Sequence, residues 1–225
     1  MNRVELINDL LESRNLKTYL EIGVDDPNST FNHIKAETKV GVDPYNDGTG
    51  CHQWNENNRE KLIGKIDSGA TFHKMTSDEY FENLDSKEKF DIVFIDGLHI
   101  KEQVERDYKN ALKHINRSKG LIIIDDICPN NEYETKTPPD VGQPWRGNVY
   151  EFWADMRGRN QKFLMVACLE LGVGVIDFSV KKNGTPKFTN INFPTYSMSW
   201  EFYNWFRVEL MNEKPTTEAR GLLGL

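Results

Sequence analysis

The 225-residue sequence has no hydrophobic run that could cross a membrane. Its longest apolar runs, 121–124 and 163–169, are far shorter than the roughly 18–20 residues that a membrane helix needs. The residues that follow Met1 are polar and acidic, so the apolar centre of a secretory signal peptide is missing as well. We therefore expect neither a membrane partner nor secretion.

Cysteine is scarce, and positive charge is in deficit. Cys51, Cys128 and Cys168 are far apart and odd in number, which excludes a disulfide framework and favours a reducing, cytoplasmic location. No Cys or His pair has the spacing of a zinc site. The 28 Lys and Arg against 35 Asp and Glu give a net charge of -7, which opposes nucleic-acid binding and favours a small-molecule or glycan acceptor.

The sequence has no internal repeat and no linker, so we expect a single domain over 1–225. Short Val- and Ile-rich runs alternate with helical stretches, which predicts an α/β doubly wound, mostly parallel sheet. The last two strands are joined by only four residues, so they must form a C-terminal antiparallel hairpin. The predicted strands are 18–24, 39–42, 71–74, 90–96, 120–125, 163–169 and 174–178.

The segments outside this core, 1–17 and 181–225, are expected to be an N-terminal helix and a C-terminal extension. Apolar residues at helical spacing over 4–16 predict a helix that covers the sheet. Apolar and aromatic stripes at 149–156 and 198–211 predict helices that pack in the core or between copies of the chain. The proline-rich stretch 127–147 predicts an irregular loop, and the residues from Lys214 onward look frayed.

The first two strands carry a ligand-binding pattern. Glu21 and Gly23 end the first strand, before a polar turn and a predicted helix whose amino terminus can hold polar ligand groups. About 20 residues later Asp43 ends the second strand, where a carboxylate can accept both hydroxyls of a ribose. Each feature alone is common in turns, but the two together in register indicate a nucleotide-type ligand. After the third strand, Ser77 or Asp78 can cap a helix and also reach an adenine ring.

Acidic residues end the fourth and fifth strands. Asp96, Asp125 and Asp126 leave neighbouring strands at the same edge, and an oxygen-only cluster suits Mg²⁺ or another divalent cation. The alternative is that they are turn and capping aspartates that face water. His99, three residues after Asp96, can remove a proton from an acceptor hydroxyl, although a lone His at a helix start is more often a cap or a surface group.

These motifs together resemble a group of small bacterial class I methyltransferases that use S-adenosylmethionine, some of them linked with surface-sugar pathways. The resemblance runs from Thr18 to Phe178 and implies a Rossmann-like, seven-stranded sheet. It also implies that Glu21 and Gly23 flank the methionine part of the cofactor, that Asp43 holds the ribose, and that Ser77 and Asp78 lie near adenine. Asp96 would lie where cofactor and acceptor meet.

The acidic set is similar to the metal site of catechol-type and macrolide-sugar O-methyltransferases. By that resemblance Asp96, Asp125 and Asp126 hold the cation, and His99 is the base. The sequence departs from the family at the turn 25–28, where the family often repeats glycine, and at Asn148, where relatives carry an acid. If the acid that Asn148 replaces has a role in acceptor binding, the acceptor of this protein is expected to differ.

Other functions remain open at this point. A nicotinamide oxidoreductase would need a Gly-x-Gly-x-x-Gly turn, and 24–30 contains no second glycine. A metal-dependent glycosyltransferase explains the aspartates but not Glu21, Gly23 and Asp43. A catalytically silent cofactor-binding or assembly subunit is compatible with the unusual first turn.

Overall fold

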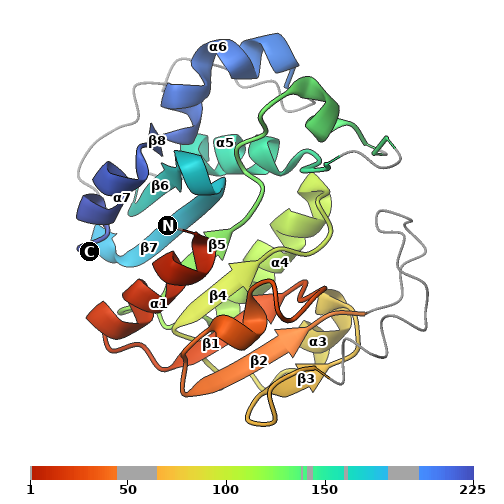
Figure 1. The fold of residues 1–225 in the computed structure, drawn as a ribbon, viewed down its shortest axis with the longest axis vertical. Coiled ribbons are helices and arrows are strands. Elements are labelled where there is room, and N and C mark those ends of the chain that lie inside the picture. Colours follow the sequence, from red (N-terminus) through yellow and green to blue (C-terminus); the bar gives the residue numbers. More distant parts are fainter. Residues whose placement is uncertain (1, 45–64, 138, 141–143, 160–161, 182–197) are drawn as a thin grey trace.

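The computed structural model describes residues 2–44, 65–137, 139–140, 144–159, 162–181 and 198–225, which contain one eight-stranded sheet (Figure 1). The strand order is β3-β2-β1-β4-β5-β7-β6-β8. The strands are β1 (Thr18–Ile22), β2 (Thr38–Val42), β3 (Thr71–His73), β4 (Ile92–Ile95), β5 (Leu121–Ile124), β6 (Phe163–Cys168), β7 (Val173–Lys181) and β8 (Glu213–Lys214).

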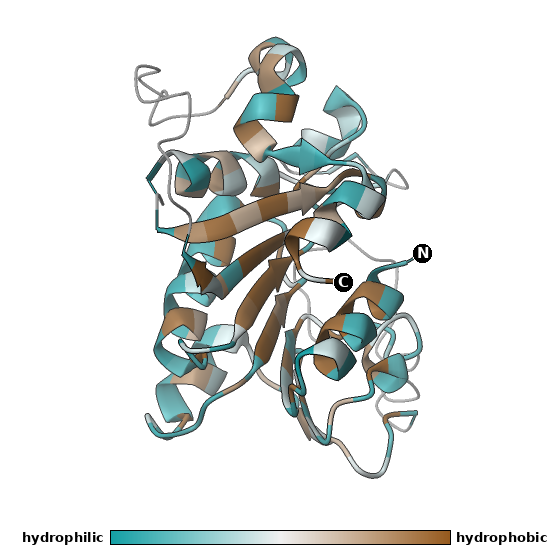
Figure 2. Ribbon diagram, turned by 90° about the vertical axis from the view of Figure 1, so that its left-hand side faces the viewer, coloured by the Kyte–Doolittle hydropathy of each residue, from teal (hydrophilic) through white to brown (hydrophobic). Residues whose placement is uncertain are grey.

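Helices cover both faces of this sheet, as a parallel sheet requires (Figure 2). Their apolar sides face the brown strands in the centre of that view. The helices are α1 (Arg3–Ser13), α3 (Ser77–Asn83), α4 (Lys101–His114), α5 (Val149–Arg159), α6 (Trp200–Met211) and α7 (Thr216–Leu222), with 3-10 turns η1 (Phe31–His33), η2 (Glu132–Thr135) and η3 (Leu169–Leu171).

The alternation of side chains along each strand divides the core into two apolar layers. Val93 and Ile95 of β4 belong to the layer that contains α3, α4, α5 and α6, whereas Ile92 and Phe94 pack with α1 and α7 on the other face. The central strands β1, β4 and β5 and the first six residues of β7 are almost completely buried. This explains why their sequences are continuous apolar runs.

The topology confirms the predicted doubly wound fold. Strands β3, β2, β1, β4 and β5 are parallel, while β7 runs antiparallel to both β5 and β6. The chain proceeds in opposite directions from β1 and from β4, so the switch point lies between these two strands, where such sheets bind ligands. The sheet has one strand more than predicted, because the short β8 pairs with the end of β6.

Two sequence-based predictions were wrong. No α-helix follows the polar turn after β1, since the only regular element before β2 is the three-residue turn η1. The helix amino terminus expected beside the ligand is therefore missing there, and α1 covers this face with Leu6, Ile7 and Leu10. The residues after Lys214 are not frayed, because α7 buries Ala219 and Leu223 follows it into the core.

The two aromatic stripes behave differently. Helix α5 buries Phe152 and Trp153 completely, whereas α6 buries Tyr203 but leaves Trp205 79% exposed. Core packing thus explains the first stripe and only part of the second.

Cys51 lies outside the described residues. None of the described helices is both long enough and apolar enough to cross a membrane.

Candidate functional site

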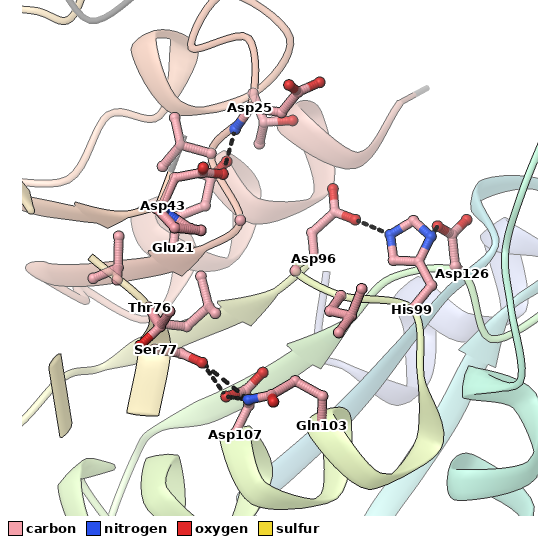
Figure 3. A pocket seen from close by; sticks show the side chains of 18 of the residues that line it. Glu21, Asp25, Asp43, Thr76, Ser77, Asp96, His99, Gln103, Asp107 and Asp126 are labelled. Atoms are coloured by element: carbon pink, nitrogen blue, oxygen red, sulfur yellow. Dashed lines mark hydrogen bonds and ion pairs between the residues drawn. The ribbon is translucent and has the colours of Figure 1, made fainter. Parts of the chain in front are cut away.

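A cavity of about 520 Å³ opens at the carboxyl ends of β1, β2 and β4, beside the switch point (Figure 3). It collects almost every residue that the sequence singled out. Its walls include Glu21, Gly23, Asp43, Ser77, Asp78, Asp96, His99 and Asp126. Asp125 does not line it, while Arg3, Asp107 and Trp145 do so unexpectedly.

Gly23 is required where β1 leaves the sheet. Its φ is +87°, and a Cβ placed on it would lie 2.0 Å from the carbonyl oxygen of Asp96. The backbone of Asp96 approaches so closely because its N–H donates to the Ile22 carbonyl at 2.8 Å. Gly23 therefore lets the ends of β1 and β4 converge.

The turn after β1 is tied to the end of β2. The backbone N–H of Asp25 donates to the Asp43 carboxylate at 3.0 Å (Figure 3). Asp25 has a φ of +44°, in the left-handed region that glycine usually occupies. Asp25 can occupy this region because Asp tolerates it better than most residues.

Glu21 is buried behind this turn and borders the cavity. The hydroxyl of Tyr19 donates to its carboxylate at 2.6 Å. Burial raises the pKa of Glu21 to about 8, in spite of the opposing effect of the Tyr19 hydrogen bond. Glu21 therefore holds a proton at neutral pH while the cavity carries no cationic ligand.

A second polar group lies at the end of the cavity next to α3. The Ser77 hydroxyl donates to Asp107 at 2.6 Å, and the Gln103 amide donates to the same oxygen at 3.0 Å (Figure 3). Burial raises the pKa of Asp107 to about 6. Neither Ser77 nor Asp78 caps α3, since Thr76 does so in a capping box with Glu79.

At the opposite end, His99 lies between two carboxylates (Figure 3). Its Nε2 is 3.5 Å from Asp96 and its Nδ1 is 3.2 Å from Asp126. Burial opposes the imidazolium, but the hydrogen bond with Asp96 and the charge of Asp126 outweigh it, so the pKa of His99 rises to about 9. Burial and the neighbouring Asp125 charge raise the pKa of Asp96 to about 7. The sequence predicted a neutral imidazole, whereas these surroundings favour the protonated one.

The loop before α5 fixes His99 in place. The Trp145 carbonyl lies 3.0 Å from Nδ1, and the two rings pack with centroids 5.1 Å apart. Gly147 has a φ of +58°, and a Cβ on it would lie 1.7 Å from the His99 carbonyl oxygen. The Asn148 side chain accepts from the first N–H of α4, on Lys101, at 2.6 Å. Asn148 thus caps α4 just beyond His99, where an acid was expected.

Asp125 is turned away from the His99 group. Its carboxylate is bound by the Arg3 guanidinium, which also lies 3.3 Å from Asp96. Its other oxygen accepts from the N–H of Asp126 at 2.9 Å. The structure therefore gathers Asp96, His99 and Asp126, whose ligand atoms lie within 4.8 Å of one another, rather than the three predicted aspartates. The predicted metal set stays a prediction.

Sequence reasoning missed Arg3, Asp107 and Trp145. Arg3 and Trp145 reach the cavity from distant parts of the chain, so no local spacing indicates them. Asp107 lies on α4, four residues after Gln103. The only sign of its role in the sequence was an acid among the positions that form the apolar side of this helix. Apolar periodicity alone does not separate such an acid from the solvent-facing positions.

Comparison with known proteins identifies a family that matches the part of the chain around the cavity. A family model described as a methyltransferase domain matches residues 20–127, which run from β1 to the loop after β5. These residues supply nearly all of the cavity wall. No curated protein sequence matches the chain. The family match supports a methyltransferase over the nicotinamide and glycosyl-transfer alternatives.

Solved structures support the same fold. A candidate O-methyltransferase from Klebsiella pneumoniae is 19% identical, with 78% of this chain and 79% of that chain covered and a TM-score of 0.52. The O-methyltransferase TomG from Streptomyces achromogenes, involved in tomaymycin synthesis and solved with S-adenosylmethionine, is 16% identical, with 80% of each chain covered and a TM-score of 0.50. Residues 20–127 of the chain thus match a methyltransferase domain, and the chain has the fold of S-adenosylmethionine-dependent O-methyltransferases.

Proposed function

We propose that the protein transfers the methyl group of S-adenosylmethionine to a hydroxyl oxygen of a sugar, a glycan or another small molecule. The observation that carries this proposal is the cavity at the switch point, with hydrogen-bonding groups at one end and a His–carboxylate group at the other. We name these the nucleotide end (Asp43, Ser77 and Asp78) and the acceptor end (Asp96, His99 and Asp126).

The nucleotide end suits the cofactor. Asp43 can accept the ribose hydroxyls, and Ser77 and Asp78 lie where the adenine would reach α3. Glu21 and Gly23 lie between the two ends, next to the expected position of the methionine part. A cofactor ammonium near Glu21 would favour the ionised carboxylate, because an opposite charge lowers the pKa of an acid.

The acceptor end suits an alcohol. In the reaction a lone pair of the hydroxyl oxygen forms the new bond to the methyl carbon, the carbon–sulfur bond breaks, and its electron pair stays on sulfur as the neutral thioether. Alignment of these three atoms supplies most of the rate. The hydroxyl proton leaves to a base, and we propose for this role the neutral form of His99, which becomes the major form only above a pH of about 9.

The surroundings of His99 define which nitrogen would act. The Trp145 carbonyl accepts from Nδ1 and so favours a proton on that nitrogen. Nε2 faces Asp96 and is then the atom that gains or loses a proton. The Trp145 ring, which borders the cavity, offers a flat apolar surface against which a sugar or aromatic ring can pack.

The sequence also predicted a divalent cation, and the side chains fit it poorly. The Arg3 guanidinium lies 3.3 Å from Asp96, one of the predicted ligands. Asp125, the third predicted ligand, is bound by Arg3 instead. We therefore assign no reaction step to a metal.

We also propose a cytoplasmic location, which the free thiols of Cys128 and Cys168 support.

The test is transfer of a labelled methyl group from S-adenosylmethionine to a panel of sugars, glycans and phenols, with amines and thiols as comparison acceptors. Label on hydroxyl compounds only, lost in a His99→Ala variant that still binds S-adenosylhomocysteine, is the expected result. Exclusive labelling of amines or thiols would contradict an oxygen acceptor, and label on no acceptor of the panel would contradict the proposed acceptor class.

A further inference from the structure

The first residue of α1 places a cation inside the acceptor end. The Arg3 guanidinium binds Asp125, lies 3.3 Å from Asp96, and donates through Nε to the Thr30 hydroxyl at 3.1 Å. Its carbon lies 5.8 Å from the centre of the Phe94 ring. The side chain is only 33% exposed and forms part of the cavity wall. These contacts on three elements fix the guanidinium at the ends of β4 and β5.

The position of Arg3 does not depend on a frayed terminus. Helix α1 buries Leu6, Ile7 and Leu10 completely against the sheet. Its amino end is closed by a capping box between Asn2 and Glu5. Because Arg3 lies in the first turn of this anchored helix, the position of the helix determines where the guanidinium enters the cavity.

The carboxylates of the acceptor end already have cationic partners. Arg3 neutralises Asp125 and contacts Asp96, and His99 bridges Asp96 and Asp126. Arg146 lies 3.0 Å from the second oxygen of Asp126. Each of the three carboxylates thus contacts at least one basic group in the described part of the chain, and Arg146 is shared with Glu134 at 2.8 Å. These basic groups reduce the repulsion between the carboxylates, so a divalent cation is not needed to reduce it.

We propose that the Arg3 guanidinium takes the place of a divalent cation between Asp96 and Asp125, and that methyl transfer by this chain needs no added metal. The second half of this inference rests on the proposed function. Mg²⁺ requires carboxylate oxygens at about 2.0–2.1 Å, and the guanidinium already binds Oδ2 of Asp125 and lies 3.3 Å from Oδ2 of Asp96. A guanidinium is permanently charged, so it can orient the acceptor oxygen and stabilise charge there.

The experiment is a titration of Mn²⁺ alone, followed by electron paramagnetic resonance, on metal-free wild type and on Arg3→Met. Arg3→Met removes the charge while it keeps an unbranched side chain. We expect wild type to bind Mn²⁺ no more tightly than about 1 mM, and Arg3→Met to bind one ion at least about tenfold more tightly. In the double variant Arg3→Met, Asp125→Asn the gained binding should be lost.

The matched control is Arg106→Met, which removes an arginine paired with Asp78 at the nucleotide end. It should leave Mn²⁺ binding as weak as in wild type. Stoichiometric Mn²⁺ binding to wild type at micromolar concentration, abolished by Asp126→Asn, would overturn the proposal. This wild-type measurement is decisive even if Arg3→Met does not fold.

A second readout concerns turnover on the acceptor found by labelling. Wild-type rates with excess EDTA should equal those with Mg²⁺ within about twofold, whereas metal-assisted chemistry would lose its Lewis acid and slow strongly. A large loss in EDTA would also overturn the proposal. If S-adenosylhomocysteine does not bind at all, the proposed function fails, but the Mn²⁺ titration still decides the role of Arg3.

Discussion

The two ends of the cavity are held together by different forces. At and beside the nucleotide end, the Asp43 carboxylate accepts a hydrogen bond from the backbone N–H of Asp25, in the turn after β1. The Asp107 carboxylate on α4 accepts hydrogen bonds from the Ser77 hydroxyl and the Gln103 amide. At the acceptor end, Asp96, Asp125 and Asp126 are balanced by Arg3, His99 and Arg146, which come from three distant segments. The first end depends on hydrogen bonds between nearby elements, and the second on charge pairing across the chain.

The largest effect should come from Gly23, which joins the two ends. Gly23→Ala adds a Cβ at 2.0 Å from the Asp96 carbonyl on a backbone with φ of +87°. Strain and overpacking together should lower the free energy of unfolding by about 3–5 kcal/mol, measured by chemical denaturation. Gly69→Ala, whose Cβ meets nothing within 4 Å, is the control. A Gly23→Ala protein as stable as wild type would mean that the strand ends do not converge as described.

His99→Ala should separate the two ends functionally. We expect the single-turnover rate of methyl transfer to fall by about 10²–10⁴-fold, because general-base catalysis is lost. Affinity for S-adenosylhomocysteine should stay nearly the same, since His99 lies at the acceptor end. His33→Ala, on an exposed turn, is the control. A normal rate with a lowered melting temperature would instead make His99 a structural residue.

Asp107 tests the nucleotide end through pH. Its pKa is raised by burial to about 6, so its contribution to stability is complete at low pH and is lost as pH rises through 6. Asp107→Asn removes this titration. Relative to wild type, the variant should therefore gain roughly 2–3 kcal/mol in free energy of unfolding between pH 4 and pH 7. Denaturation at both pH values measures this difference.

The surface variant Glu12→Gln provides the baseline for that comparison, because Glu12 is exposed on α1. It should show no gain of this kind. A difference between Asp107→Asn and wild type that does not change with pH would show that Asp107 is not buried as an acid.

The smallest effect should come from the cap that the acceptor-end loop supplies to α4. Asn148→Ala removes the acceptor of the Lys101 N–H and should lower stability by about 1 kcal/mol, seen as a lower melting temperature. Asn110→Ala, on the exposed side of the same helix, should change it little. If both variants melt alike, the loop does not hold the start of α4.

The sequence indicated the cavity residues at the ends of β1 and β2 better than the surroundings of His99, for a physical reason. Glu21, Gly23 and Asp43 lie at the ends of strands whose apolar runs and spacing are visible in the sequence, and the parallel sheet brings them together. Arg3 and Trp145 join the site only through tertiary packing, which leaves no local pattern. For the same reason the sequence did not show that no helix follows β1. The face that this helix would cover is covered instead by α1, from another part of the chain.

The most direct test of the account is the affinity for S-adenosylhomocysteine, measured by calorimetry on wild type, Asp43→Ala and the exposed-turn control Asp85→Ala. Loss of charge-assisted hydrogen bonds to the ribose should cost about 1.5–3 kcal/mol, which weakens binding by roughly 10–150-fold in Asp43→Ala alone. Equal affinity of a folded Asp43→Ala protein and wild type would contradict the cofactor site, as would a wild-type protein that binds no S-adenosylhomocysteine.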